Sequence, residues 1–316
     1  MDLGVNLPTA NTRHTSPEAI VRIAQAAERL GYGAVWTFER LLYPTGDVAQ
    51  PGGPPRPLPE VYKVAYDPLE TLAYVAAGTQ RIKLGTSVVD ALFHTPVVLA
   101  KRYATLDVFS GGRAIAGLGQ GWMAQEFRTA NVPPRRKGAG MDEFVAAMRA
   151  VWGPDPVRYR GRFYRIPESI LNPKPVQPGG PPILLGAMSP AGLERAARIA
   201  DGINPIAFAY EQLAGLVEGF RAAARAIGRD PATLKVVVRV NNAIAPAPLP
   251  EAGRAFLSGS AAQLAADLSR LLPLGLDHVF FGTGAAPTVE DEVALLEALI
   301  GAASAAGVAV APAPPV

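Results

Sequence analysis

Short apolar segments alternate with longer segments of helical periodicity along almost the whole chain. Nearly continuous apolar runs that are bounded by helices are typical of strands buried on both faces of a parallel sheet. The sequence predicts eight such strands, at Leu3–Leu7, Ala34–Phe38, within Arg81–Asp90, and at Ala114–Leu118, Ile183–Leu185, Asp201–Ile206, Leu234–Ile244 and His278–Phe281.

Helical patterns separate these strands, and several have start and stop signals. Ser16 is expected to cap a helix that Pro17 opens, and Gly31 is expected to end it. The predicted helices are Pro17–Leu30, Pro68–Gly78, Thr95–Phe109, Ala124–Asn131, Met141–Trp152, Pro190–Ala200, Tyr210–Ile227, Ala261–Leu272 and Thr288–Ala305. Eight strand–helix units predict an α/β fold that closes into a TIM (β/α)8 barrel, with a doubly wound open sheet as the structural alternative.

Two insertions and a tail interrupt this repeat. Residues 41–62 are rich in Pro and Gly and too long for an ordinary connection, so we expect a functional loop or lid. Residues 154–182 contain two short runs, Val157–Tyr159 and Phe163–Ile166, that predict a small hairpin. We therefore expect one barrel domain over residues 1–308 and a frayed tail over residues 309–316.

Composition excludes several classes of function. Of the 316 residues, 49% are hydrophobic. The net charge is only +3 and the sequence contains no basic run, so no nucleic-acid partner is expected. The absence of cysteine excludes disulfides, thiolate metal sites and a cysteine nucleophile. No apolar run is long enough to span a bilayer and no signal peptide is visible, which predicts a cytoplasmic protein. The three histidines have no metal-site spacing.

Function in such barrels lies at the C-terminal ends of the strands. The fourth strand ends at Gly119, Gln120 and Gly121, whose glycine spacing does not match a dinucleotide fingerprint. These residues make either a tight turn or a backbone site for phosphate. Ser189, after the fifth strand, either caps the next helix or also binds an anion.

Candidate polar groups follow the second and third strands. Glu39 and Arg40 are either an exposed ion pair or a pair that faces a substrate. His94 is a candidate general acid in the loop after the third strand. His278 enters the eighth strand from its N-terminal end and is expected to be structural, while Trp122 suits either ring stacking or packing.

The chain resembles the luciferase-like monooxygenase family, and within it the deazaflavin-dependent oxidoreductases that use coenzyme F420. No single segment is specific, but together the order and spacing of the matching segments are characteristic. The segments that carry the resemblance are Leu3–Pro8, Gly31–Trp36, Asp67–Glu70, Ile82–Val89, Leu106–Gly121 and Pro173–Gln177.

The resemblance implies a TIM barrel that binds F420 or FMN at the strand C-termini, with a non-proline cis peptide at Ser87–Val88 beneath the cofactor ring. Thr86, whose small side chain also suits simple packing, would join Ser87 and Val88 in supporting that ring. The family's phosphate contacts fall on Gln120, Gly121, Ala187, Met188 and Ser189.

Two departures bear on the substrate. Sugar-phosphate dehydrogenases of the family have an Asp-His pair where this chain has Glu39 and Arg40, and a Glu where it has Trp122. Arginine stays protonated and so is no general acid, although it can neutralise a carboxylate, a phosphate or a developing enolate. A sugar-phosphate dehydrogenase is therefore not expected. Flavin-dependent relatives often hold phosphate with an arginine near Gln120, and its absence from this stretch favours the deazaflavin.

These observations predict an F420-dependent oxidoreductase that transfers a hydride between the deazaflavin and a small-molecule substrate. Glu39, Arg40 and His94 are the predicted catalytic residues. One alternative is an FMN-dependent monooxygenase that uses reduced flavin and oxygen with a reductase partner. The other is a non-catalytic flavin-binding protein. The resemblance further implies a homodimer.

Overall fold

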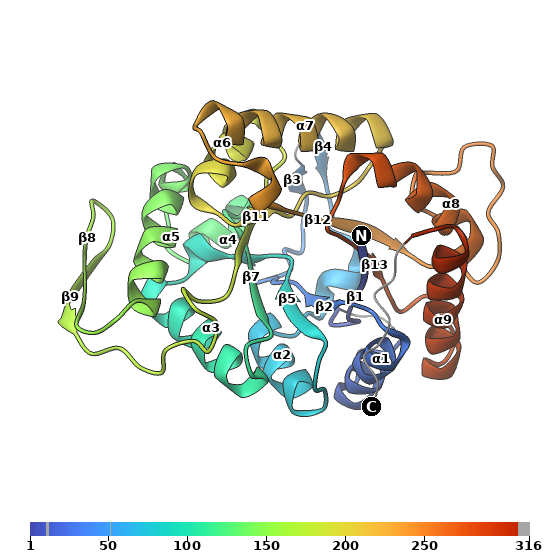
Figure 1. The fold of residues 1–316 in the computed structure, drawn as a ribbon, viewed down its shortest axis with the longest axis horizontal. Helices are drawn as coiled ribbons and strands as arrows, with labels where there is room; N and C mark the ends of the chain where they lie inside the picture. The colour runs from blue at the N-terminus through green and yellow to red at the C-terminus, as the bar shows by residue number, and fades with distance from the viewer. Residues whose placement is uncertain (11–12, 51, 309–316) are drawn as a thin grey trace.

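The computed structural model describes residues 1–10, 13–50 and 52–308, and its centre is a ring of eight parallel strands (Figure 1). Each strand pairs with its neighbours, and β10 also pairs with β7, which closes the ring. This closure confirms the TIM barrel and excludes the open sheet. The barrel strands are β1 (Asp2–Asn6), β2 (Ala34–Thr37), β5 (Lys83–Thr86), β7 (Ala114–Gly119), β10 (Ile183–Leu185), β11 (Gly202–Ile203), β12 (Lys235–Ala243) and β13 (His278–Gly282).

Helices surround the ring of strands (Figure 1). The first begins as predicted, because the Ser16 hydroxyl accepts a hydrogen bond from the amide of Ala19 at 3.1 Å, and Gly31 ends it with φ of 89°. The helices are α1 (Pro17–Leu30), α2 (Pro68–Ala77), α3 (Pro96–Ser110), α4 (Ala124–Thr129), α5 (Ala139–Trp152), α6 (Pro190–Ile199), α7 (Tyr210–Ala226), α8 (Ala261–Leu271) and α9 (Val289–Ala305).

Two strands differ from their predicted lengths. The third predicted strand stops at Thr86, and a two-residue strand, β6 (Val89–Asp90), then pairs with the end of β7. The sixth is regular only over Gly202–Ile203, because Pro205 has no amide hydrogen to continue the ladder. The chain rejoins β12 where the amide of Ala207 donates to the carbonyl of Arg239 at 2.9 Å.

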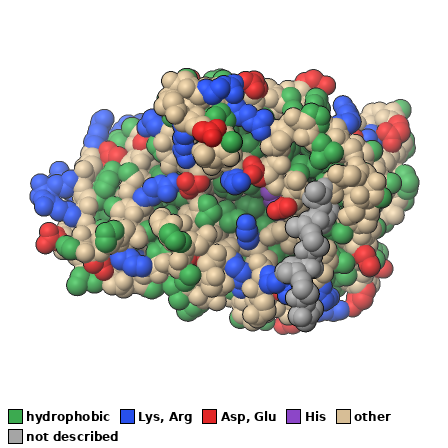
Figure 2. Space-filling model, in the orientation of Figure 1, with side chains coloured by type: hydrophobic (Ala, Val, Ile, Leu, Met, Phe, Trp, Pro, Cys, Tyr) green, Lys and Arg blue, Asp and Glu red, His purple; other side chains and the backbone are tan. Residues whose placement is uncertain are grey.

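Both insertions contain a β-hairpin. The first, predicted only as a loop, contains β3 (Val48–Gln50) and β4 (Gly53–Arg56), followed by a 3-10 turn at Glu60–Lys63. The second contains the expected hairpin as β8 (Val157–Arg160) and β9 (Arg165–Ser169), with the second strand beginning two residues later than predicted. Lys and Arg side chains cluster over β8 and β9 (Figure 2). Residues 309–316, predicted as a frayed tail, lie outside the described residues.

At the N-terminal end of the barrel, side chains pack around His278 beside a cavity of about 250 Å³. Its Nε2 atom lies 3.0 Å from Nε1 of Trp36, and a Cβ atom on Gly4 would come within 2.2 Å of the same nitrogen. Burial, with smaller contributions from Lys83 and the N-terminal amine, lowers the pKa of His278 to about 3. His278 is therefore neutral at physiological pH and serves packing, as predicted.

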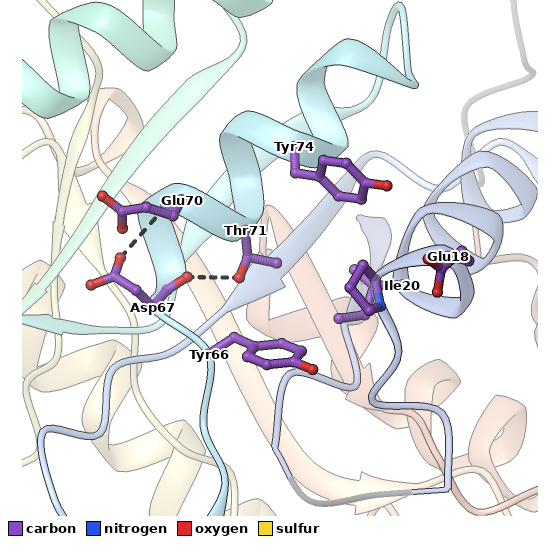
Figure 3. A pocket seen from close by; sticks show the side chains of 8 residues that line it. Glu18, Ile20, Tyr66, Asp67, Glu70, Thr71 and Tyr74 are labelled. Atoms are coloured by element: carbon purple, nitrogen blue, oxygen red, sulfur yellow. Dashed lines mark hydrogen bonds between the residues drawn. The ribbon is translucent and has the colours of Figure 1, made fainter.

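A cavity of about 520 Å³ lies on the outside of the barrel, beside α1 and α2 (Figure 3). Asp67 caps α2 there by accepting the amide of Leu69 at 3.0 Å, and its carbonyl accepts the Thr71 hydroxyl at 2.6 Å. Tyr66 and Tyr74 line the opening. None of the lining residues follows a barrel strand directly, so this cavity is separate from the strand ends where the site is expected.

Candidate functional site

A cavity of about 300 Å³ lies at the C-terminal ends of the barrel strands. Residues at the ends of five barrel strands, β2, β5, β7, β11 and β12, meet there, and the first insertion supplies part of the wall. The strand-end residues are Phe38, Glu39, Arg40, Ser87, Val88, Asp90, Trp122, Ile206, Arg239 and Asn241. The insertion residues are Gln50, Arg56, Leu58, Pro59 and Tyr62. The predicted functional loop thus lines the cavity.

The Ser87–Val88 peptide is cis, as predicted, and both of its residues are held by neighbouring strands. Arg239 donates from Nη1 to the carbonyl of Ser87, and the amide of Glu39 donates to the carbonyl of Val88 at 3.1 Å. The Ser87 hydroxyl donates to the side-chain oxygen of Asn204 at 2.5 Å. Contacts from β2 and from the segments after β11 and within β12 therefore fix this turn.

Space around the Val88 side chain is provided by two glycines. A Cβ atom on Gly119 would lie 2.6 Å from a methyl group of Val88, which is closer than such contacts allow. A Cβ atom on Gly186 would lie 3.4 Å from the other methyl group. The ends of β7 and β10 thus approach Val88 closely, and Gly119 in particular is required for this approach.

Thr86 lies in the barrel wall and does not line the cavity. Its side chain is buried, pairs with the Tyr103 hydroxyl at 2.7 Å and donates to the carbonyl of Gly117 at 2.8 Å. The hydroxyl therefore connects β5 to α3 and β7. Its contribution to the site is to hold the strand that carries Ser87.

Two of the three predicted catalytic residues line the cavity, and the third lies behind them. Glu39 accepts the amide of Asp90 at 2.7 Å through one oxygen, and its other oxygen lies 2.7 Å from Nε2 of His94. His94 is not among the lining residues. The structure therefore makes His94 a positioning residue for Glu39.

The guanidinium of Arg40 interacts with other side chains of the protein. Its Nη1 atom lies 2.9 Å from a carboxylate oxygen of Glu126, and its guanidinium lies over the rings of Tyr62 and Trp122, at 5.3 and 5.6 Å. The other oxygen of Glu126 accepts the amide of Leu41 at 2.9 Å. Burial raises the pKa of Glu126, although Arg40 partly offsets this effect. Trp122 therefore packs against Arg40 at the cavity wall.

Asp90 is a cavity residue that sequence reasoning did not single out. One carboxylate oxygen accepts the amide of Gly121 at 2.9 Å. The pKa of Asp90 is raised to about 7, chiefly by burial and also by the nearby Glu39 and Glu126, while Arg40 and the Gly121 amide act against this rise. A carboxyl group in the cavity wall thus changes its protonation near neutral pH. Its place at the end of the third apolar stretch was the only sequence signal.

Arg239 was also missed, although it is a charged residue inside the apolar seventh strand. Besides its bond to Ser87, it donates from Nε to the side chain of Asn241 at 2.8 Å and lies 5.3 Å from the ring centre of Phe38. Burial lowers the pKa of its guanidinium. An arginine stays protonated even so, which leaves a fixed positive charge beside the Ser87–Val88 turn.

The predicted phosphate contacts are partly brought together. Gln120 and Ala187 line a small cleft with Arg195 of α6, and the Ser189 hydroxyl accepts the amide of Gly192 at 3.2 Å at the start of that helix. The Gly121 amide is already used by Asp90.

Three of these residues, Gly121, Met188 and Ser189, do not line the cleft. The side chain of Met188 is 37% exposed, and its sulfur accepts the amide of Ile206 at 3.4 Å.

The expectation that no arginine lies near Gln120 is wrong, because Arg195, from a distant part of the sequence, lines the same cleft. The absence of a local arginine therefore carries no weight in choosing the cofactor.

Metal sites and membrane-spanning helices are two further classes of feature, considered for residues 1–10, 13–50 and 52–308. Within these ranges, no three His, Asp or Glu side chains form a group that could hold a metal ion. No helix in the same ranges combines the length and apolar character needed to cross a bilayer.

Comparison with known proteins places the barrel among redox enzymes. The sequence model of the luciferase-like monooxygenase family matches residues 1–269. An uncharacterised protein of Mycobacterium tuberculosis (strain H37Rv) is 35% identical over 64% of this chain and 71% of its own. The crystal structure of a monooxygenase from Streptomyces bottropensis superposes with a TM-score of 0.75 at 24% identity, covering 95% of this chain and 98% of the other.

Two relatives with named activities differ in cofactor. The F420-dependent glucose-6-phosphate dehydrogenase of Kineococcus radiotolerans is 28% identical over 72% of this chain and 65% of its own. The FMNH(2)-dependent dimethylsulfone monooxygenase of Pseudomonas putida is 31% identical over 48% of this chain and 42% of its own. The matches span less than two thirds of either relative.

Proposed function

Because the chain belongs to the luciferase-like monooxygenase family, we propose that it is an oxidoreductase that binds coenzyme F420 and transfers a hydride to or from a small organic substrate. The observation that carries this proposal is the meeting of two features at the C-terminal end of the barrel. The cavity wall contains the Ser87–Val88 turn, and the cleft with Gln120, Ala187 and Arg195 lies next to it through the contact between Val88 and Gly186.

The residues present fit such a cofactor. Aromatic and aliphatic side chains form much of the cavity wall, with a few polar groups among them, which is typical of cofactor pockets. The start of α6 and Arg195, whose Nε is also paired with Asp142 at 2.8 Å, favour a negative group beside Gln120. A bound deazaflavin would supply or accept the hydride, since that chemistry belongs to the cofactor.

Several residues in and behind the cavity wall have roles that follow from their contacts. Arg239 and the amide of Glu39 hold the carbonyls of the Ser87–Val88 turn on which the ring would rest. His94 orients Glu39, and Asp90 is the group that can take up or release a proton near neutral pH. Aromatic side chains around Arg40 exclude water from the same space.

Relatives that are named for their cofactor support F420 first and FMN second. The match to the F420-dependent dehydrogenase extends over more of this chain than the match to the FMNH(2)-dependent monooxygenase. One observation favours FMN as the second candidate, namely the arginine that the fold brings beside Gln120. An FMN-dependent monooxygenase would consume oxygen with reduced FMN and would need a reductase as a partner.

Replacing Ser189 by Asp tests the phosphate end of the site. Asp is as good a helix cap as Ser, so α6 should stay intact while a negative charge enters the proposed phosphate position. We expect F420 affinity, followed by fluorescence of the deazaflavin, to fall by roughly tenfold or more, as repulsion between close like charges costs more than 1 kcal/mol. The matched control is Ser16→Asp at the cap of α1, which should leave affinity unchanged. Equal F420 affinity in both variants would refute the phosphate assignment.

The homodimer, the reductase partner and the cytoplasmic location stay predictions.

The non-catalytic alternative is tested by turnover. Tight binding of F420 with no substrate reduced or oxidised across a broad panel would support storage or sensing of the cofactor. Turnover of any panel member would refute it.

A further inference from the structure

We propose that the substrate is a small organic anion with an apolar body and that Arg56, in the first insertion, binds its anionic group. This inference rests on the proposed function, since it assigns the substrate side of the same cavity. Arg56 lies at the end of β4 and lines the cavity together with the strand-end residues.

Arg56 differs from the other arginines of the cavity because its guanidinium has no assigned partner. Arg40 pairs with Glu126, and Arg239 donates to Ser87 and Asn241. Among the described residues, the ion pairs and side-chain hydrogen bonds include none from the guanidinium of Arg56. Its backbone, by contrast, pairs with Val48 in the hairpin, and its carbonyl accepts the side-chain amide of Gln50 at 3.5 Å. A planar guanidinium with free donors is suited to a carboxylate or a phosphate.

The acidic residues of the cavity do not compensate for this charge. Both oxygens of Glu39 are occupied, one by the amide of Asp90 and one by His94. Burial raises the pKa of Asp90 to about 7, so this carboxyl is partly neutral at physiological pH. Because Arg40 is paired with Glu126, Arg56 and Arg239 face Glu39 and the partly neutral Asp90 in the lining, and the local field favours an anion.

The backbone of Arg56 is held by the base of its hairpin, and the residue itself is exposed. In the β3–β4 register Arg56 is opposite Val48, which is buried in a cluster with Leu58 and Met123. The hairpin is therefore anchored at the end where Arg56 lies.

The remaining lining describes the body of the ligand. Leu58, Tyr62 and Trp122 present apolar surface in the wall of the same cavity as Arg56. Such surface favours an aryl or alkyl group by the hydrophobic effect, while the guanidinium selects the charge. Carboxylate, sulfonate and phosphate share this chemistry, and a compound with the same body but no charge should be rejected.

Calorimetric titration with benzoate, phenyl phosphate and benzamide tests the inference, on the protein with and without F420. We expect an anionic probe to bind roughly tenfold or more tightly than benzamide, the margin expected of a charge-assisted hydrogen bond. Arg56→Gln should remove that preference. The control Arg160→Gln, on the β8–β9 hairpin outside the cavity, should keep it. The stronger of the two anionic probes identifies the carboxylate or the phosphate as the preferred group.

Two results would overturn the inference, namely equal affinity for benzoate, phenyl phosphate and benzamide, or an unchanged preference in Arg56→Gln. The proposed function fails separately, when F420 itself does not bind in a fluorescence titration. Because the calorimetric titration is also made without cofactor, anion selectivity is measured in either case.

Discussion

The two ends of the barrel each bury an ionisable side chain beside a cavity, but with opposite consequences. At the N-terminal end His278 is 7% exposed, and at the C-terminal end Asp90 is 8% exposed. Burial disfavours the charged form of both groups, so it lowers the pKa of His278 to about 3 and raises that of Asp90 to about 7.

The difference lies in the neighbours. His278 meets Trp36, with the positive charges of Lys83 and the N-terminus at longer range, and stays neutral at any physiological pH. Asp90 lies near Glu39 and Glu126, with Arg40 acting against them. The same desolvation thus makes one group a packing element and places the other where a proton can be exchanged at working pH.

Asp90→Asn should produce the largest effect on this comparison. With a raised folded-state pKa, Asp90 contributes stability that is complete below about 3.8 and lost as pH rises through about 7. The variant lacks this loss, so above pH 7 it should be the more stable protein, by up to about 4 kcal/mol for a three-unit difference. Thermal unfolding of both proteins across this pH range measures it. A stability difference that does not change with pH would show that Asp90 does not titrate there.

Gly4→Ala should disturb the opposite end by overpacking. The new Cβ atom would lie 2.2 Å from Nε2 of His278 and 2.9 Å from the carbonyl of Ala34. We expect a loss of about 2–3 kcal/mol, with no change in F420 affinity. The control Gly215→Ala, in α7 with no atom within 4 Å of its Cβ, should be neutral or slightly stabilising. Denaturant unfolding distinguishes the two, and equal stability would contradict the packing at Gly4.

His278→Leu should cost about 1–3 kcal/mol at pH 8, because the buried Nε1–H of Trp36 loses its acceptor. His278→Gln keeps an acceptor and should recover part of the loss. Wild-type stability should also fall as pH drops below about 6.5, since the folded-state pKa of His278 is lowered, and this fall should be smaller in both variants. Chemical unfolding at pH 5 and pH 8 tests both statements. Identical pH profiles of stability in all three proteins would show that His278 does not cause this fall.

The smallest effect is expected on the exposed β8–β9 hairpin, away from both ends. Arg160 and Arg165 are directly opposite each other, and like charges in this position are destabilising. Arg165→Glu should stabilise the protein by about 0.5 kcal/mol at low salt and less at high salt, unlike the buried groups. Melting temperatures at two salt concentrations measure this, and a gain that is independent of salt would exclude a Coulombic origin.

Local pattern was sufficient to predict the barrel and its strand ends, while the cis peptide at Ser87–Val88 was predicted only through the family resemblance. It was insufficient for Arg239 and Arg195, which reach the site from distant segments. A single charged residue forms no periodic pattern, so its contact with a distant segment cannot be predicted from the sequence. Asp90 was visible in the sequence, but its raised pKa depends on the fold. The fold buries Asp90 and brings the carboxylates of Glu39 and Glu126 near it.

The central claim is that the C-terminal end of the barrel binds F420, and it is tested most directly by titrating the purified protein with F420 and with FMN. Ring fluorescence reports each binding event. The account predicts micromolar or tighter binding of F420, weakened in Ser189→Asp and unchanged in Ser16→Asp. Binding of FMN alone would contradict the cofactor assignment, and binding of neither would contradict the proposed site.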